Sequence, residues 1–242
     1  MSFVPYPDIT DEDFYNKLFW KKEFLSTMYR SDFQYSKTEE LCKRGEFKMQ
    51  NHQEFIRNFI SPETPYNGAL LFHGTGVGKT CAAIGVTEGL RDYVHRNGKK
   101  IYILSSENIR PNFYKELYDE NREKAEREIH GVPGSYQCSG SRYYLSGKSD
   151  TKARAIKDLI KEYYVFKGFG QFANFVDVDL GAQLPPHMAE PRITTLDDDG
   201  NSVSVDIGDY FNNSVIVIDE AHGMAGEDKS GKLAEDEEED DI

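Results

Sequence analysis

The eight residues at positions 73–80, HGTGVGKT, have the composition of a loop that binds a triphosphate. Phosphate oxygens are bound by closely spaced backbone N–H groups, and glycine leaves that backbone open because it has no side chain. Lys79 supplies a mobile positive charge for the β- and γ-phosphates, and the Thr80 hydroxyl can ligate Mg²⁺. Position 73 is histidine where such loops usually begin with glycine, while the rest of the motif is intact. Within this octapeptide, called the phosphate loop below, the residues expected to bind the nucleotide are Gly74, Thr75, Gly76, Val77, Gly78, Lys79 and Thr80.

Two adjacent acidic residues, Asp219 and Glu220, supply the second half of the expected chemistry. They directly follow the β-branched run VIVI at 215–218, which predicts a strand covered on both faces. Mg²⁺ prefers one or two carboxylates together with water and phosphate oxygens, so Asp219 is the predicted metal ligand beside Thr80. Glu220 can orient and deprotonate the attacking water as a general base. Glu220 and Lys79 are therefore the predicted catalytic residues.

The patterns around the phosphate loop predict the elements that position it. Residues 68–72 have the apolar run of a buried strand, and residues 79–94 place apolar side chains along one helical face. Residues 101–104 form a second apolar run after the Asn97-Gly98 turn signal. A strand–helix–strand unit of this size predicts two parallel strands with a right-handed crossover. The loop would then precede a helix N-terminus, where free amides and the positive end of the helix dipole favour an anion.

Other patterns extend the prediction along the chain. Helical spacing of apolar residues covers four further segments, at residues 11–35, 51–60, 112–129 and 152–165. Residues 193–196 and 203–207 flank the turn signal DDGN at 198–201 and predict a β-hairpin. That acidic turn lacks the ligand spacing of a calcium-binding loop, so a plain turn is the better interpretation.

Composition limits the class of protein. The 242-residue chain has a net charge of −13, of which residues 227–242 contribute −7. Nucleic-acid binding usually needs a basic face, so the bulk charge does not support it, although a local basic groove remains compatible with this sum. No apolar run reaches the roughly 18 residues of a membrane span, and the N-terminus lacks a signal-peptide pattern, so we expect an intracellular protein. The three cysteines show no CxxC spacing, which indicates neither a disulfide framework nor a zinc site.

The two motifs together carry a family resemblance. The sequence GVGKT at 76–80 with Asp-Glu-Ala-His at 219–222 resembles superfamily 2 helicases of the DEAD/DEAH type. The stretch from Thr64 to Gly76 is similar to helicase-like ATPases of nucleocytoplasmic large DNA viruses, which include early transcription factor and transcript-release ATPases. The resemblance covers roughly residues 51–223. It implies an α/β, RecA-like P-loop NTPase fold with a mostly parallel sheet, incomplete, with a β-hairpin insertion. Together with the patterns on either side of it, this predicts a helical N-terminal extension at 1–50, a first RecA-like domain at 51–226, which is incomplete, and an acidic tail at 227–242 whose charge run without apolar periodicity indicates disorder.

The resemblance also implies cofactors and partners. ATP and Mg are the implied cofactors. Gln53 would hydrogen-bond the adenine edge, since a carboxamide both donates and accepts, with an ordinary surface glutamine as the open alternative. Residues 105–108, SSEN, correspond in position to a motif that contacts nucleic-acid backbone, although Glu107 would oppose that role. The implied partners are DNA or RNA, with RNA polymerase or other transcription proteins as further candidates and no membrane. A viral protein of this kind would be found in the host cytoplasm or the virion.

Parts of the family pattern are missing from this sequence. A Ser/Thr-Ala-Thr motif and a second RecA-like domain bearing an arginine finger do not follow Asp-Glu-Ala-His, and one interior strand of the sheet is not supplied. A sheet without an interior strand would expose edges. We therefore expect ATP hydrolysis in a longer protein, and weak ATP binding with negligible hydrolysis by this chain alone. Three functions stay open: a nucleic-acid helicase or translocase, a transcription-factor or transcript-release ATPase that remodels without unwinding, and an interaction module that keeps the nucleotide site as a switch.

Overall fold

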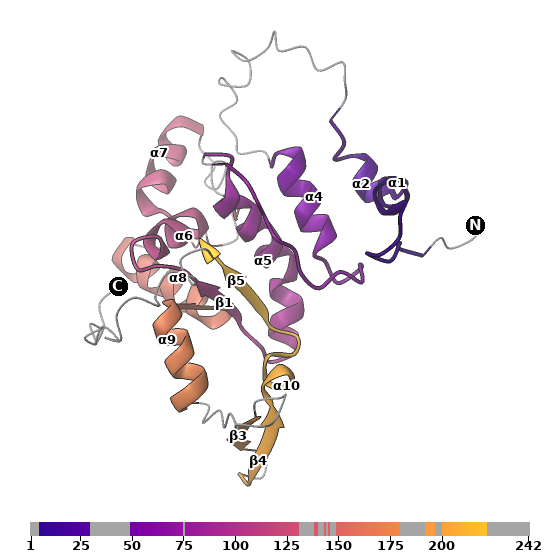
Figure 1. Ribbon diagram of the computed structural model, residues 1–242. Helices are drawn as coiled ribbons and strands as arrows, with labels where there is room; N and C mark the ends of the chain where they lie inside the picture. The colour runs from indigo at the N-terminus through magenta and orange to yellow at the C-terminus, as the bar shows by residue number, and fades with distance from the viewer. Residues whose placement is uncertain are drawn as a thin grey trace, which may run out of the picture. The chain divides into compact units, whose positions relative to one another are not determined.

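The computed structural model describes residues 5–29, 49–74, 76–130, 138, 139, 143, 145, 149–179, 192–196 and 200–221. These residues belong to two compact units. The first unit comprises residues 1–101 and 111–164, and the second comprises residues 102–110 and 165–242 (Figure 1). The first is helical, whereas the second contains a small parallel sheet, so the predicted α/β class is confirmed.

The first unit begins with two short helices, α1 at Phe14–Phe19 and α2 at Lys22–Leu25. The prediction of one helix over residues 11–35 is wrong within the described part of that range, because the chain turns at Lys21, whose ψ of 137° is extended. Leu18 and Phe24 are both fully buried in one cluster. In a straight helix these two residues would lie roughly 120° apart around the axis, so the turn allows both to enter the same core.

Helix α4, at Asn51–Phe59, completes this aromatic cluster and confirms the helix predicted at 51–60. Phe59 stacks on Tyr66 with ring centroids 4.3 Å apart, and the Tyr66 hydroxyl donates to the Pro7 carbonyl at 2.8 Å. Aromatic pairs of this kind stabilise beyond the area they bury. The cluster therefore attaches the N-terminal segment to the helix that precedes the phosphate loop.

Helix α5, at Lys79–Arg96, follows the phosphate loop as predicted and ends at the Asn97-Gly98 turn, where Gly98 has φ of 66°. It lies beside α4 (Figure 1). A Cβ at Gly85 would lie 2.0 Å from the terminal methyl of Met49, which precedes α4, so this flexible side chain would have to shift. The Met49 side chain thus occupies the space that the glycine leaves on α5.

Three further helices follow in the described part of the chain: α6 at Arg110–Leu117, α7 at Glu120–His130 and α8 at Ser149–Tyr163. The single helix predicted over 112–129 is wrong. Asp119 interrupts it, because its carboxylate accepts the backbone N–H of Asn121 at 2.9 Å and of Arg122 at 3.3 Å, as an N-cap does. The new helix α7 therefore begins directly after Asp119.

A disulfide joins Cys81 in the first turn of α5 to Cys138. The sequence did not indicate this bond, because cysteine spacing of 57 residues carries no local signal. The bond attaches the start of α5 to a segment far along the chain.

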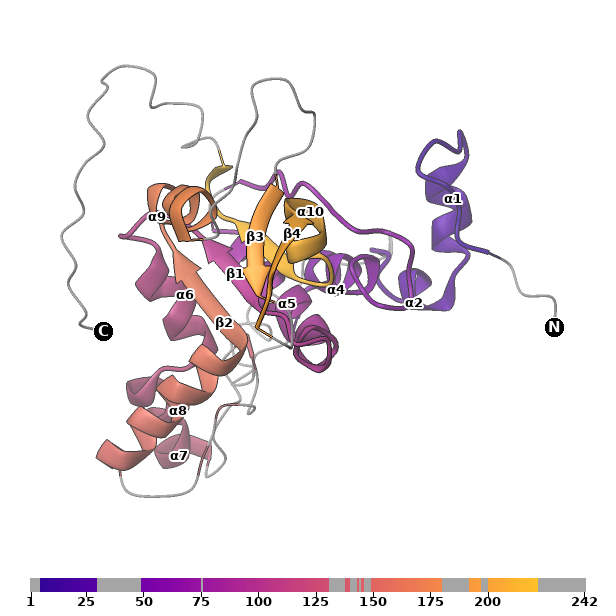
Figure 2. The ribbon, with the colours of Figure 1, turned by 90° about the horizontal axis from the view of Figure 1, so that it is seen from below.

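The sheet of the second unit has the order β2-β1-β5, with β2 at Tyr164–Lys167, β1 at Ile101–Leu104 and β5 at Val215–Ile218. The strands are parallel (Figure 2). The central strand β1 is buried throughout, which confirms the strand predicted there. Strand β2 was not predicted, and the predicted helix at 152–165 ends before it. The edge strand β5 forms as expected, but Ile216 and Ile218 are each about two-fifths exposed, so the expectation of burial on both faces is wrong.

The strand predicted at 68–72 is wrong, because these residues are irregular and pair with no strand among the described residues. Leu70 is 85% exposed and Phe72 is 95% exposed. A strand exists only where its N–H and C=O groups bond to a neighbouring strand, so an apolar run alone does not make one. The predicted crossover between two parallel strands on either side of α5 is therefore also not formed.

The second unit also contains the predicted hairpin, formed by β3 at Arg192–Leu196 and β4 at Ser202–Asp206 (Figure 2). The strands are antiparallel, with Arg192 opposite Asp206. Helix α9 at Phe169–Asn174, a π-helical turn at Phe175–Asp179 and helix α10 at Ile207–Phe211 bring aromatic rings around Tyr102 of β1. In the described part of the chain, no helix has both the length and the apolar character to cross a membrane.

Candidate nucleotide-binding site

The glycines of the phosphate loop differ in backbone conformation and in the space around them. Gly76 and Gly78 have φ of 80° and 81°, in the left-handed region that residues with a side chain rarely adopt. Nothing lies within 4 Å of a Cβ built on Gly74 or Gly76, so their backbone is accessible. Thr75 lies outside the described residues. These glycines adopt the conformation and openness that the sequence motif predicts for binding phosphate oxygens.

The loop leads directly into α5, with Gly78 as the residue before the first helical turn. The first amides of a helix have no partner within the helix, and the helix dipole is positive at this end. Lys79 and Thr80 are the first two helical residues, and both are half-buried. The arrangement can bind an anion through backbone amides, the lysine charge and the threonine hydroxyl.

Two side chains at the start of α4 hydrogen-bond the phosphate loop. Gln53 is 3% exposed, and its Nε2 donates to the Gly78 carbonyl at 3.1 Å. Its Oε1 accepts the backbone N–H of Gln50 at 2.9 Å, so both ends of the amide have partners. The role of Gln53 in binding adenine stays a prediction. The neighbouring His52, which sequence reasoning missed, places Nε2 at 3.1 Å from the Val77 carbonyl.

The acidic residues Asp219 and Glu220 lie at the carboxyl end of β5, in the second unit. The Asp219 N–H donates to the Leu104 carbonyl at 2.9 Å, which continues the pairing of β5 with β1. Glu220 has φ of 54°, a left-handed conformation that is uncommon for a residue with a side chain and concentrates at functional sites. His222 lies outside the described residues.

The predicted nucleic-acid contact segment at 105–108 follows β1, so it leaves the same end of the sheet as Asp219. Ser105 is fully buried, and its hydroxyl has no hydrogen-bond partner among the residues that the structure describes. Ligands of open parallel sheets bind outside the carboxyl ends of the strands. The phosphate loop belongs to the first unit and these residues to the second, so their convergence on one nucleotide stays a prediction.

The described residues include one group that resembles a metal site, formed by Cys81, Glu116 and Cys138. Both sulfur atoms are in the disulfide. Both carboxylate oxygens of Glu116 accept hydrogen bonds from Arg122, at 2.9 and 3.1 Å. A metal would have to displace these partners, so this group is not a metal centre in its present state.

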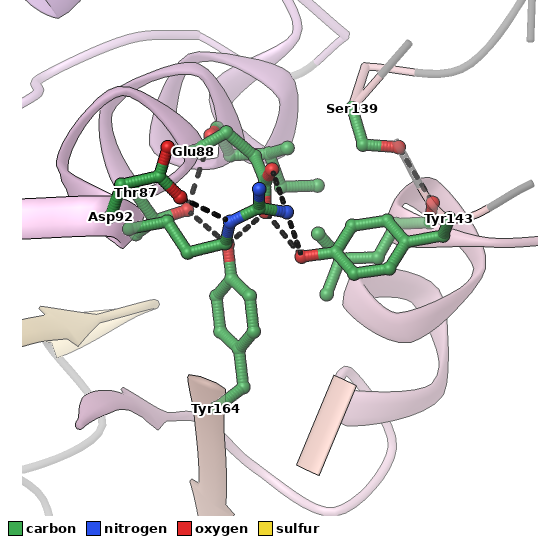
Figure 3. Close-up of polar contacts among 9 residues, drawn as sticks. Thr87, Glu88, Asp92, Ser139, Tyr143 and Tyr164 are labelled. Carbon is green, nitrogen blue, oxygen red and sulfur yellow. Dashed lines mark hydrogen bonds and ion pairs between the residues drawn. The ribbon is translucent and has the colours of Figure 1, made fainter. Parts of the chain in front are cut away.

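A buried polar network on α5 was also missed by sequence reasoning (Figure 3). The carboxylate of Glu88, 6% exposed, accepts the Tyr143 hydroxyl at 2.6 Å and the Tyr164 hydroxyl at 2.5 Å. Arg91 lies 3.4 Å from the same carboxylate. Burial, followed by the charge of Glu88, raises the pKa of both phenols. The phenols therefore stay protonated and donate to Glu88. These two bonds attach segments that are distant in the sequence to α5, the helix that follows the phosphate loop.

The chain is similar in sequence to several viral proteins. The chain is 28% identical over 245 residues to a "Putative ATP-dependent RNA helicase" of Acanthamoeba polyphaga mimivirus, an alignment that covers 91% of this chain and 20% of the relative. A second mimivirus protein of the same description is 26% identical over 93% of this chain and 32% of its own length. A "Putative helicase" of Invertebrate iridescent virus 3 is 27% identical over 72% of this chain and 15% of its own length.

These similarities confirm the resemblance to helicase-like proteins of large DNA viruses. The chain spans about a fifth and a third of the lengths of the two mimivirus relatives. No family model matches the chain, and no solved structure matches it.

Proposed function

We propose that this chain forms the ATP-binding part of an ATP-dependent nucleic-acid helicase or translocase that hydrolyses ATP with Mg²⁺. The observation that carries the proposal is the open glycine loop with left-handed Gly76 and Gly78, which leads directly into the helix that begins with Lys79. The similarity to viral proteins with helicase names, over nine-tenths of this chain, supports it independently.

Each residue has a specific task in the proposed reaction. Loop amides and Lys79 bind the phosphate oxygens and stabilise the negative charge that develops on them. Thr80 and Asp219 would hold Mg²⁺, which would supply positive charge to neutralise the phosphate oxygens. Glu220 orients the attacking water and accepts its proton. The roles of Asp219 and Glu220 both require the second unit to meet the first around the nucleotide.

Binding of MgATP by the 242-residue chain tests the proposal. We expect weak but measurable binding of a fluorescent ATP analogue, and a loss of at least about tenfold in Lys79→Ala, because hydrogen bonds to charged groups contribute roughly 1.5–3 kcal/mol. Lys99→Ala is the matched control. It removes the same charge beyond the far end of α5, roughly 27 Å away along an 18-residue helix. Equal affinities of Lys79→Ala and Lys99→Ala would contradict the proposed site.

The alternative reading is an ATPase of a viral early transcription factor or transcript-release complex, which would remodel its target without separating strands. The helicase names of the relatives favour the first reading. A strand-displacement assay with a longer protein that contains this chain separates the two readings. ATP-dependent unwinding supports the helicase, whereas nucleic-acid-stimulated hydrolysis without unwinding supports the alternative.

A further inference from the structure

Two adjacent side chains of α4 bond to consecutive carbonyl groups of the phosphate loop. The His52 Nε2 lies 3.1 Å from the Val77 carbonyl oxygen, and the Gln53 Nε2 lies 3.1 Å from the Gly78 carbonyl oxygen. A carbonyl oxygen can only accept, so both nitrogens donate. These contacts reach the loop from a segment 25 residues earlier in the chain.

These bonds also control where the loop amides point. In a planar trans peptide, the C=O and the following N–H point in opposite directions. A donor that holds the Val77 carbonyl toward α4 therefore turns the Gly78 N–H away from α4. In the same way, holding the Gly78 carbonyl turns the Lys79 N–H away from α4. These two amides stand where the loop enters α5, the position at which a phosphate group would be bound.

The two carbonyls do not depend equally on α4. The Gly78 carbonyl also accepts the Ala82 N–H at 3.0 Å, the first hydrogen bond of the helix, so its peptide plane is held without Gln53. The Val77 carbonyl precedes the helix, and the bond from His52 orients it from outside the loop. His52 is thus the side chain on which the Gly78 amide direction depends most.

The ring of His52 has neighbours on both nitrogens. The Tyr29 hydroxyl lies 3.3 Å from Nδ1, which suits a ring that accepts at Nδ1 and carries its proton on Nε2. The side chain of Asn51 donates to the Met28 carbonyl at 3.3 Å, so the end of the N-terminal segment is attached at the same point. The His73 ring stands edge-on to His52 at 5.3 Å. Residues from two segments, the N-terminal segment and the phosphate loop, therefore hold the ring in place.

We propose that His52 is a positioning residue for the phosphate loop, which orients the Gly78 amide and thereby sets the affinity for the phosphate groups of the nucleotide. This inference rests on the proposed ATP-binding function. It assigns to the residue beside Gln53 a task that concerns the phosphates rather than the base.

Substitutions of His52 that keep the reach of the donor nitrogen, shorten it or remove the donor test this role. In His52→Gln the amide nitrogen reaches about as far as Nε2 of histidine, whereas in His52→Asn the same amide is too short. Binding of MgATP and of inorganic tripolyphosphate, which has no base, is measured by displacement of a fluorescent ATP analogue. We expect His52→Asn and His52→Ala to weaken both ligands by the same factor, about 3- to 10-fold, as expected for one neutral hydrogen bond. His52→Gln should restore most of the affinity.

The outcomes separate this inference from the proposed function. Wild-type affinity of His52→Ala for both ligands would overturn the role of His52 and leave the ATP site intact. A loss for ATP with none for tripolyphosphate would also overturn it, since His52 would then act on the base. If the unaltered chain bound neither ligand, the proposed function would fail together with this inference.

Discussion

Removal of the Glu88 carboxylate should destabilise the first unit severely, although Glu88 is nine positions beyond Lys79 on α5. In Glu88→Ala the hydroxyl groups of Tyr143 and Tyr164 lose the acceptor that they bond at 2.6 and 2.5 Å. Arg91, whose side chain is 15% exposed, loses the buried partner of its ion pair. Tyr143 is fully buried, so its hydroxyl cannot turn to water.

The size of the loss follows from these contacts. Two hydrogen bonds to a charged acceptor contribute roughly 1.5–3 kcal/mol each. Tyr164 keeps a neighbour in the Thr87 hydroxyl at 3.1 Å, which offsets about 1 kcal/mol. The expected decrease in the free energy of unfolding is therefore about 2–5 kcal/mol, and its upper part coincides with the roughly 3–5 kcal/mol lost when one partner of a buried ion pair is removed. Glu88→Gln keeps an acceptor oxygen but loses the charge, so about 2 kcal/mol is expected.

Urea denaturation followed by far-ultraviolet circular dichroism measures these values. Tryptophan fluorescence is a poor probe, because the single tryptophan, Trp20, is 85% exposed. Asp92→Asn is the matched control, since Asp92 pairs with the same Arg91 at 3.2 Å but is 72% exposed, and should cost less than about 1 kcal/mol. If Glu88→Ala were no less stable than Asp92→Asn, the network would contribute nothing and the reasoning would be refuted.

Two further predictions concern the disulfide and the sheet. Reduction of Cys81–Cys138 should lower the free energy of unfolding by about 4 kcal/mol, from the chain entropy of a loop with a sequence separation of 57. Urea denaturation with and without a phosphine reductant measures this loss. If the reductant lowered the stability of Cys138→Ser as well, the loss could not be assigned to this disulfide. Burial, with a contribution from Tyr210, raises the pKa of Tyr102 to about 12, so its phenol contributes stability that is fully present below about pH 10 and lost as pH rises toward 12. The free energy of unfolding of Tyr102→Phe, measured from about pH 9 to 12, should therefore fall less steeply with pH than that of the unaltered chain. Identical pH dependence in the two proteins would contradict this role of Tyr102.

Elements with strong local signals were predictable from the sequence. The 3.6-residue periodicity of α4 and α5 and the turn after α5 required only neighbouring residues, and all three are confirmed. The hairpin is confirmed for the same reason, because its turn residues and alternating strands are adjacent in the chain. The break between α6 and α7 also had a local signal, because aspartate is a preferred N-cap residue and Asp119 caps α7. The helical periodicity on both sides of Asp119 obscured this signal.

Elements that depend on a distant partner were not predictable. Residues 68–72 have the composition of a strand but lack a bonded neighbour among the described residues, whereas β2 forms because β1 lies beside it. The Ile216 and Ile218 side chains show the same dependence, since an apolar edge strand is buried on both faces only where other elements cover both. Strand pairing is decided by contacts across long sequence separations, which single-sequence patterns do not record.

The sequence by itself determined the chemical composition of the phosphate loop, because the glycines at 76 and 78 and the lysine at 79 act through local backbone conformation and their own charge. Only the tertiary structure decided which side chains hold that loop and its helix. His52 reaches the loop across 25 residues, and Tyr143 and Tyr164 reach Glu88 across 55 and 76 residues. A hydrogen bond requires its atoms to meet within about 3 Å, and for residues so far apart in the chain that meeting is set by how the helices pack.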